Sequence, residues 1–356
     1  MKRLARTANY LVFTKIDAYC RRISADKWIM KPVYIRGPHP TLHKIFVLIY
    51  CFLCFLPYLT AQTTDAGADT GDRYLSSSVI RVNSSLVSVP VAVTDVSGQV
   101  ITGLYIDDFH LSEDSRPVKI SGLADSSRLN IALLLDVSGS VNHNFEFEQN
   151  AAINFLKRIW KEGDVVTIIS FDEQSYVHLK SGDNLQEAMW TLRQVRPTGK
   201  TTSFFDAVTL AAQLIEQSAE EDTRQAIIVI SDGADNTSKS SLASTLTEMQ
   251  RRNTVFYAIN PSDSAIVRLN RVIAKGQENL EALVKATGGL VFVSDENRDL
   301  ENIFGKILSE LRTQYLIMYY SLIQRMDGKF HTIEVFVPGR PELNIRARPG
   351  FLAAPR

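Results

Sequence analysis

Apolar and polar residues alternate in LVSVPVAVTD (residues 86–95), which is the period of a strand with one buried face. The turn segment DVSGQVITG follows, and then the runs DFHLSED and RPVKISGLA. Together with residues 86–95, these segments give four β runs before residue 125. The pattern returns after residue 313 in three runs, QYLIMYYSLI, FHTIEVFVP and NIRARPGF. Four runs and three make seven, a number typical of a small antiparallel sandwich.

Strand and helix patterns alternate between residues 129 and 312. The run NIALLLD (130–136) is apolar without interruption, as expected for a central parallel strand that is covered on both faces. Residues 145–160 have the spacing of a helix, and a later helix ends at Gly288. The apolar residues of the first helix that lie four apart are Phe147, Ala151, Phe155 and Ile159. This alternation predicts an α/β fold, a doubly wound, mostly parallel, Rossmann-like sheet.

The boundaries between these patterns predict an insertion. We expect the α/β domain to lie within an antiparallel β-sandwich that segments on both of its sides build, with two unrelated β extensions as the alternative. The predicted segments are a leader (1–61), a polar linker (62–77), an amino-terminal sandwich segment (78–125), the α/β domain (126–313) and a carboxyl-terminal sandwich segment (314–356).

The leader contains the segment HKIFVLIYCFLCFLPYLTAQ. Its apolar core is followed by Pro57 and by small residues up to Ala61, which predicts a secretory signal that is cleaved near Ala61. A membrane span needs about 20 apolar residues and this run is shorter, so an uncleaved anchor is the alternative and the only expected membrane contact. Met30 is an alternative start. The expected location is secreted, periplasmic or at the cell surface.

The chain holds 39 basic and 39 acidic residues, but their distribution is uneven. The first 61 residues hold ten bases and two acids, so the other 295 hold 29 bases and 37 acids, a net charge of −8. A nucleic-acid partner is not expected without a basic footprint. All three cysteines precede residue 62, and the six histidines form no HExxH pair, which argues against disulfides and a zinc enzyme in the body of the chain.

Oxygen-bearing side chains follow the ends of predicted strands. Asp136 ends the first α/β strand, Ser138 and Ser140 follow it, and Asp232 ends the strand AIIVISDG. Ligands of doubly wound sheets bind at this edge, and oxygen donors without sulfur or imidazole indicate a hard cation, Mg²⁺ or Ca²⁺. Two carboxylates bring a dication near neutrality, and neutral hydroxyls add coordination without charge. We therefore expect a site whose cation accepts a carboxylate from a partner protein.

Three motifs resemble those of von Willebrand factor A domains. DVSGS matches the signature D-x-S-x-S, SDGADN matches the second aspartate motif, and PTGKTTSFFDA is similar to P-x-G-G-T-x-x-x-D-A. The resemblance covers about 129–312, and the flanks resemble those of secreted bacterial proteins of this family. It implies a metal-ion-dependent adhesion site that binds Mg²⁺, with Ca²⁺ or Mn²⁺ as alternatives. The implied metal ligands are Asp136, Ser138, Ser140, Thr202 and Asp232, with Thr201 as the alternative threonine.

Neighbouring polar residues have simpler interpretations. We expect Asp172 to solvate a loop, Asp235 and Asn236 to form a turn, and Asp206 to cap or orient its helix. Lys200 stands where the family has a glycine, and its ammonium near the cation is expected either to weaken metal binding or to help hold an anionic partner.

Together these features predict an exported binding module without enzymatic activity. TGKTT lacks the first glycine of a phosphate-binding loop, Ser138 lacks a G-x-S-x-G elbow, and His143 is expected in a solvated loop. The alternatives are a structural assembly factor whose site has lost its metal and a metal-dependent hydrolase.

Overall fold

The computed structural model describes residues 86–353 with seven gaps. The gaps are 125–127, 140–144, 219–222, 263–266, 268, 295–299 and 322–326. The predicted leader and linker, and with them the secretory signal and the alternative anchor, lie outside the described residues, as do Ser140 and His143.

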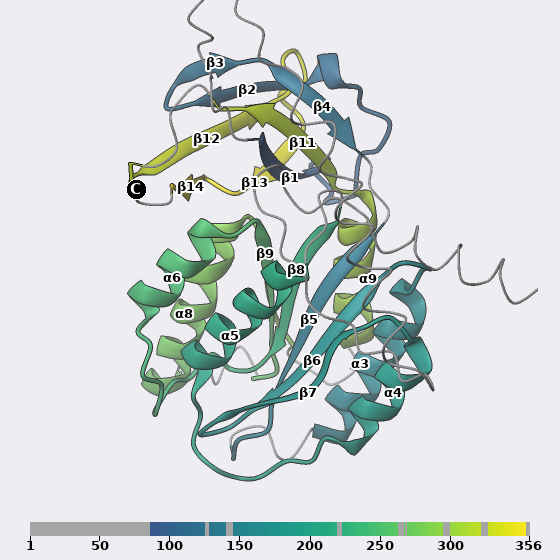
Figure 1. Cartoon of the computed structure of the whole chain (residues 1–356), viewed down its shortest axis with the longest axis vertical. Helices are drawn as coiled ribbons and strands as arrows, with labels where there is room; N and C mark the ends of the chain where they lie inside the picture. Colours follow the sequence, from purple (N-terminus) through teal and green to yellow (C-terminus); the bar gives the residue numbers. More distant parts are fainter. Residues whose placement is uncertain are drawn as a thin grey trace, which may run out of the picture. The chain divides into compact units, whose positions relative to one another are not determined.

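A six-stranded sheet forms the centre of the α/β domain, in the order β10-β9-β8-β5-β6-β7 (Figure 1). All neighbouring strands are parallel except the edge strand β7, which is antiparallel to β6. The bounds are β5 (Leu129–Asp136), β6 (Val165–Phe171), β7 (Ser175–Gly182), β8 (Arg224–Ile230), β9 (Thr254–Asn260) and β10 (Val291–Val293). The prediction of a mostly parallel, doubly wound sheet is confirmed.

Helices cover both faces of this sheet (Figure 1). On one face lie α3 (Phe145–Ile159), α4 (Leu185–Gln194) and α9 (Leu300–Thr313), and on the other α5 (Phe204–Gln217), α6 (Leu242–Arg251) and α8 (Arg271–Thr287). Alternate residues of β5 enter the two cores, Leu133 the first and Leu134 the second, so every residue of this strand is buried. Gly288 ends α8 as predicted, in the left-handed conformation with φ 78°.

The buried stripe of α3 contains three of the four predicted residues, Ala151, Phe155 and Ile159, but not Phe147. Phe147 is 37% exposed, whereas Glu148 is only 2% exposed. The stripe begins at Phe145 and continues through residues three or four apart, such as Ala152 and Phe155. The buried face therefore includes a carboxylate.

Two antiparallel sheets form the predicted sandwich, and each takes strands from both sides of the α/β domain. One has the order β13-β1-β11-β4 and the other β14-β12-β2-β3. Their strands are β1 (Leu86–Thr94), β2 (His110–Glu113), β3 (Arg116–Val118), β4 (Ile120–Ala124), β11 (Tyr315–Tyr320), β12 (Phe330–Phe336), β13 (Asn344–Ala347) and β14 (Gly350–Leu352). One core joins residues of both flanks, among them Val89, Leu111 and Ile317.

The sandwich has eight strands in the described residues of the chain, so the prediction of seven was wrong. The runs RPVKISGLA and NIRARPGF each form two strands, whereas DVSGQVITG contributes only an isolated bridge between Val100 and Thr94. The run NIRARPGF is divided because the chain leaves one sheet for the other at Arg348 and Pro349. β13 pairs with β1, whereas β14 pairs with β12. Pro349 has no N–H for a sheet ladder, and its carbonyl accepts a bond of 2.8 Å from the N–H of Ile333.

The sandwich contacts the α/β domain at the end of α8. Residues Val79–Arg356 form one compact unit. A Cβ on Gly288 would lie 2.6 Å from the backbone of Ala347 and Arg348, so the helix end and β13 approach each other closely. The Arg346 guanidinium donates to the carbonyl of Gly288 and pairs with Glu310 of α9.

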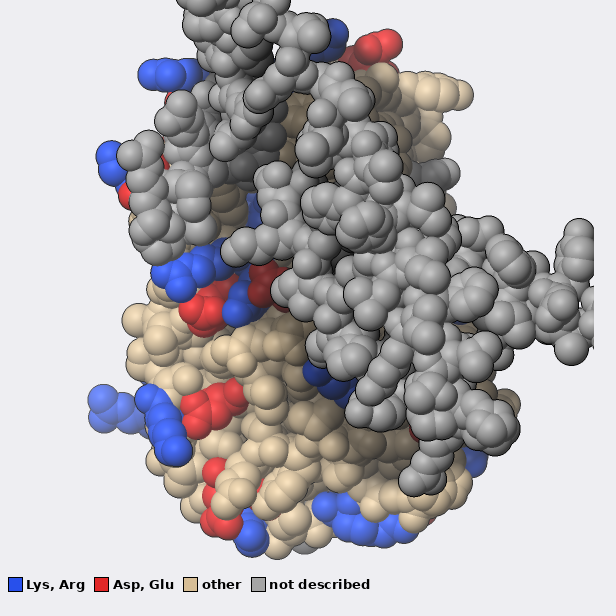
Figure 2. Space-filling model, in the orientation of Figure 1, with Lys and Arg blue, Asp and Glu red and all other residues tan. Residues whose placement is uncertain are grey.

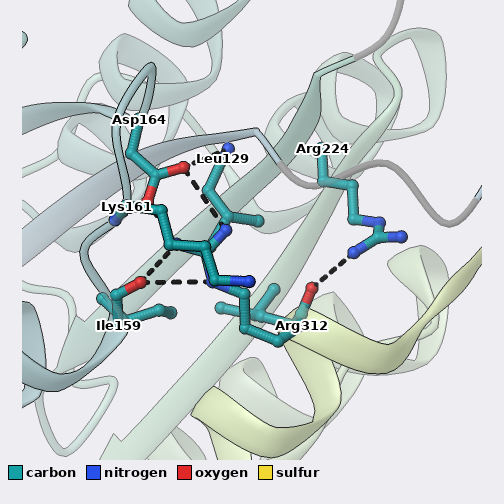
Figure 3. A network of polar contacts seen from close by, with 7 residues as sticks. Leu129, Ile159, Lys161, Asp164, Arg224 and Arg312 are labelled. Carbon is teal, nitrogen blue, oxygen red and sulfur yellow. Dashed lines mark hydrogen bonds and ion pairs between the residues drawn. The ribbon is translucent and has the colours of Figure 1, made fainter.

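A polar network joins the amino-terminal edge of the central sheet to α9 (Figure 3). The Asp164 carboxylate accepts from the N–H groups of Leu129, at 2.9 Å, and Lys161, at 2.8 Å, and pairs with Arg312. Arg224 donates to the carbonyl of Leu311 at 2.9 Å. This network lies at the edge opposite the carboxyl ends of the strands.

The surface of the described residues mixes both signs of charge. On the face shown in Figure 2, basic and acidic side chains lie interspersed. Within the described ranges, no helix combines the length and the apolar character that crossing a membrane requires.

Candidate metal centre

Asp136 is the last residue of β5, at the carboxyl edge of the sheet. Asp136 is 1% exposed, and its side chain accepts hydrogen bonds from Ser138 and Ser231. The N–H of Ser138 donates to Oδ1 at 3.0 Å, and the hydroxyl of Ser231 donates to Oδ2 at 2.7 Å. These bonds fix the orientation of the carboxylate. Because both donors are neutral, they do not compensate its negative charge.

Asp232 follows the neighbouring strand β8 and lies close to Asp136. β5 and β8 pair in parallel up to Leu135 and Ile230, so both chains leave the sheet at the same level. Asp232 is 4% exposed, and its Oδ1 accepts from the N–H of Ala234 at 2.9 Å. Burial raises the pKa of Asp136 to about 6 against the bonds from Ser138 and Ser231, and the charge of Asp232 adds to the rise. Two mutually repelling carboxylates are therefore buried together.

The segment that contains Thr202 connects the loops of both aspartates. The carbonyl of Lys200 accepts from the N–H of Gly139 at 3.0 Å, and the carbonyl of Thr202 accepts from the N–H of Asn236 at 2.9 Å. Thr202 is 3% exposed, whereas the alternative, Thr201, is exposed. Thr202 thus lies between the two aspartate loops.

The other predicted hydroxyl ligands have different outcomes. Ser138 is 1% exposed and lies directly after the Asp136 strand. Ser140 lies outside the described residues. Four of the five predicted residues, Asp136, Ser138, Thr202 and Asp232, therefore lie in three loops whose backbones are joined by hydrogen bonds.

Asp172 and Asp235 have other roles than we predicted. Asp172 is fully buried instead of solvating a loop, and its carbonyl accepts from the N–H of Ser203 at 2.6 Å. Asp235 does more than form a turn, because its Oδ1 accepts from the N–H of Phe205 at 3.2 Å and so caps α5. Neither contact is visible in sequence, because the partners lie about 30 residues away.

Asp206 holds a distant loop, whereas we predicted that it caps or orients its own helix. Its carboxylate accepts from the N–H groups of Lys239 and Ser240, both at 2.9 Å. Burial alone would raise the pKa of Asp206, but the bonds from these two residues outweigh it and lower the pKa. Asp206 therefore ties the start of α5 to the loop that follows Asp232.

Lys200 lies at the rim of the site with its ammonium paired. Its Nζ lies 2.8 Å from Oε1 of Glu173, and both side chains are nearly half exposed. The pKa of Lys200 is raised by this partner. The effect that we predicted for this ammonium, on the cation or on an anionic partner, stays a prediction.

Glu148 is a residue that sequence reasoning missed. It lies on the first turn of α3, is 2% exposed, and its Oε1 is buried without a hydrogen-bond partner among the described residues. Burial first, and then the charges of Asp136 and Asp232, raise the pKa of Glu148 to about 8. The available signal was the helical phase, because a carboxylate on a buried helix face needs a partner.

The described residues fit a hard divalent cation. Their donors are carboxylate and hydroxyl oxygens, buried negative charge accumulates around Asp136, and one carboxylate oxygen of Glu148 has no partner among them. No group of three His, Cys, Asp or Glu side chains with metal-binding geometry occurs where the structure describes the chain. Hydroxyl oxygens would therefore have to contribute to holding the ion.

Comparisons with known proteins point to one family. Residues 131–234 match the family model described as von Willebrand factor type A domain. A comparison with curated proteins finds no match.

Solved structures that resemble the chain have low identity. The conserved hypothetical protein BatB from Bacteroides thetaiotaomicron is 16% identical over 51% of this chain and 98% of that chain, with a TM-score of 0.41. Proximal thread matrix protein 1 from the mussel byssus, with a zinc-occupied MIDAS motif, is 16% identical over 57% of this chain and 50% of that chain, with a TM-score of 0.45. A von Willebrand factor type A protein from Catenulispora acidiphila is 8% identical over 77% and 75%, with a TM-score of 0.43. Similarity of this degree carries no argument about what the chain binds.

Proposed function

We propose, from the match of residues 131–234 to the von Willebrand factor type A domain, that the chain is an exported binding module without enzymatic activity. In this proposal a divalent cation at the Asp136 site docks an acidic group of a partner protein. The β-sandwich serves as the platform of the binding domain.

The observation that carries the proposal is the uncompensated charge of the site. Asp136 and Asp232 are both buried at the ends of adjacent strands, and the bonds to the Asp136 carboxylate come from the neutral groups of Ser138 and Ser231. A buried carboxylate without a counter-charge is costly, so such a pair is most useful where a cation completes it.

Five side chains would hold the cation, and these are Asp136, Ser138, Ser140, Thr202 and Asp232. Mg²⁺ is the cation we expect, with Ca²⁺ and Mn²⁺ as alternatives, because all five donors are oxygens. When bound, the cation supplies positive charge and a coordination position for an outside oxygen. The serine and threonine hydroxyls contribute donors without charge, so a carboxylate is the preferred outside group.

Two other functions compete with this one. A structural assembly factor would keep the loops but work without metal, and a hydrolase would need a general base at the site. The three histidines in the described ranges lie elsewhere: His110 and His331 belong to the sandwich, and His178 of β7 bonds Ser170 at 2.7 Å. We propose a secreted, periplasmic or cell-surface location on the basis of the leader sequence alone.

Cation binding by the purified full chain is the first test. Electron paramagnetic resonance of free Mn²⁺ should show one bound ion per wild-type chain and none for Asp136→Ala. The matched control is Asp183→Ala, which removes an exposed carboxylate after β7, where Gly182 pairs with Val166 at the opposite edge of the sheet. Equal Mn²⁺ binding by wild type and Asp136→Ala would disprove the site.

Partner binding is the second test. Immobilised wild-type protein should retain an envelope protein in Mg²⁺ and release it in EDTA, and Asp136→Ala should not retain it. Retention that ignores both EDTA and the substitution would favour the assembly factor. Turnover of generic ester or phosphate substrates that depends on Asp136 would favour the hydrolase.

A further inference from the structure

The hydroxyl of Ser231 bonds to the segments of both predicted aspartate ligands. Ser231 follows β8 directly and is fully buried, with an exposed fraction of 0%. Its hydroxyl donates to Oδ2 of Asp136 at 2.7 Å and accepts from the N–H of Gly233 at 3.1 Å. One side chain therefore connects the end of β5 with the turn that contains Asp232.

The central sheet fixes the backbone of Ser231. Its N–H donates to the carbonyl of Ile259 in β9 at 3.1 Å, so the parallel pairing of β8 with β9 continues past Ile230. The hydroxyl is thus attached to the sheet itself, and its bond to Asp136 joins two strands that are direct neighbours. Because the donor has a fixed position, the bond restricts the rotation of the Asp136 carboxylate.

The bond from Gly233 closes the turn around Asp232. Gly233 has φ 74°, in the left-handed region, and a Cβ there would lie 2.4 Å from the carbonyl oxygen of Gly276, so this position requires glycine. Loss of the Ser231 hydroxyl would remove the donor to a buried carboxylate oxygen and the acceptor of the Gly233 N–H at the same time. The geometry of both aspartate segments therefore depends on one hydroxyl.

We propose that Ser231 is a positioning residue of the cation site, whose hydroxyl orients the Asp136 carboxylate and closes the turn that presents Asp232. This inference rests on the proposed cation site and adds a residue that is not one of the five predicted ligands. A hydroxyl suits this role because it is neutral. It holds the carboxylate in one orientation and leaves the negative charge for the ion.

Two substitutions of the same shape isolate the hydroxyl. Ser231→Thr keeps it and adds a methyl group, whereas Ser231→Val has the same branched shape without a hydroxyl. Electron paramagnetic resonance of free Mn²⁺ with the full chain should show that Ser231→Thr binds like the wild type. Ser231→Val should bind Mn²⁺ about 10- to 100-fold more weakly than Ser231→Thr.

The matched control removes a buried serine hydroxyl that bonds to neither aspartate. Ser170 of β6 is 3% exposed, and its hydroxyl lies 2.7 Å from Nε2 of His178. Ser170→Ala should therefore bind Mn²⁺ as the wild type does. A fall in affinity equal to that of Ser231→Val would show that loss of any buried hydroxyl in this sheet disturbs the site, which would overturn the specific role of Ser231.

Thermal unfolding in EDTA separates positioning from a general loss of stability. Ser231→Val should unfold at a lower temperature than Ser231→Thr, because two buried polar groups lose their partner. The Mn²⁺ titrations are made below both transitions, where each variant is folded. A purely structural role predicts equal affinities there, whereas a positioning role predicts the difference stated above. If Ser231→Val does not fold, Ser231→Ala removes the same hydroxyl without added bulk and is compared with the wild type.

The failure of this inference differs from the failure of the proposed function. If the wild type binds Mn²⁺ and Asp136→Ala does not, but folded Ser231→Val binds as tightly as Ser231→Thr, the cation site stands and the positioning role of Ser231 is wrong. If the wild type binds no Mn²⁺, the cation site is wrong, and this inference with it.

Discussion

Gly276 offers a direct test of how the fold holds Asp232 in place. This glycine lies in α8, against the loop that follows β8. A Cβ at this position would lie 2.3 Å from the carbonyl oxygen of Asp232 and 2.8 Å from the nitrogen of Ala234. Ordinary contact begins at 3.4 Å, and both neighbours are backbone atoms, so Gly276→Ala must displace the helix or the loop by about 1 Å.

The displacement should cost both stability and cation affinity. Alanine in place of glycine favours a helix by about 1 kcal/mol, whereas overpacking costs about 1–3 kcal/mol, so a net loss of about 1 kcal/mol is expected. The side-chain amide of Asn279 bonds the carbonyl of Gly233 at 3.0 Å, so α8 cannot retreat without losing that bond as well. A shifted Asp232 should lower the affinity for Mn²⁺ about tenfold.

Gly305→Ala is the matched control. It also adds a methyl group to a helix, but among the described residues the only atom near its Cβ is Nη2 of Arg158 at 3.9 Å. We expect it to stabilise the protein by about 0.5–1 kcal/mol and to leave Mn²⁺ binding unchanged. Urea unfolding in EDTA and Mn²⁺ titration followed by electron paramagnetic resonance measure both effects. If Gly276→Ala behaves like Gly305→Ala, close packing by α8 does not position Asp232.

Three further predictions concern pH and the opposite edge of the sheet. In EDTA, the free energy of unfolding should fall as the pH rises from about 4 to about 8, because folded Asp136 and Glu148 keep protons that the unfolded chain releases. In urea titrations at several pH values, Asp136→Asn and Glu148→Gln should each make this fall smaller. Burial lowers the pKa of His331, but its two aspartate partners outweigh burial and raise the pKa. The contribution of His331 to the free energy of unfolding is therefore complete below about pH 6.5 and is lost as the pH rises through the raised pKa. The free energy of unfolding of His331→Gln, measured at several pH values, should lack this pH-dependent contribution. Asp164→Asn should cost about 1.5–3 kcal/mol in urea unfolding, because it removes the charge that pairs with Arg312. An unchanged Mn²⁺ affinity is expected because the network lies at the other edge of the sheet, and a stability within about 1 kcal/mol of the wild type would contradict the pairing.

Local patterns were sufficient to predict the central sheet and the placement of its acids. The apolar run that ends at Asp136 can satisfy its backbone and bury both faces only as a central strand, and this fixed the loop that follows it at the carboxyl edge. The same argument placed Asp232, since its strand has the same pattern. The fold class led us to expect that these two strands end at the same edge, and the structure shows that β5 and β8 are direct neighbours.

Features that depend on distant partners were not predictable in this way. The stripe predicted for α3 was wrong only at Phe147, which fits the four-residue spacing of Phe155 but is exposed, whereas Phe145 and Glu148 are buried. The eighth strand was missed because the exchange between sheets at Pro349 depends on pairing with β12. The periodicity of apolar residues predicts which face of an element is buried. It does not predict which distant residue a buried polar side chain contacts.

The site also has a consequence for the stability of the protein as a whole. Buried acids at the carboxyl edge weaken the cation-free fold, and the extensive cores on both faces of the sheet must tolerate that cost. A cation present at about 100 times its dissociation constant would return about 2.7 kcal/mol, because it binds the folded chain alone. The stabilisation by Mn²⁺ and the fall in stability with pH should therefore have a common origin in the acids of the site. Removing the charge of Asp136 should diminish both effects together, and a variant that lost one while keeping the other would show that the acids and the ion do not share a site.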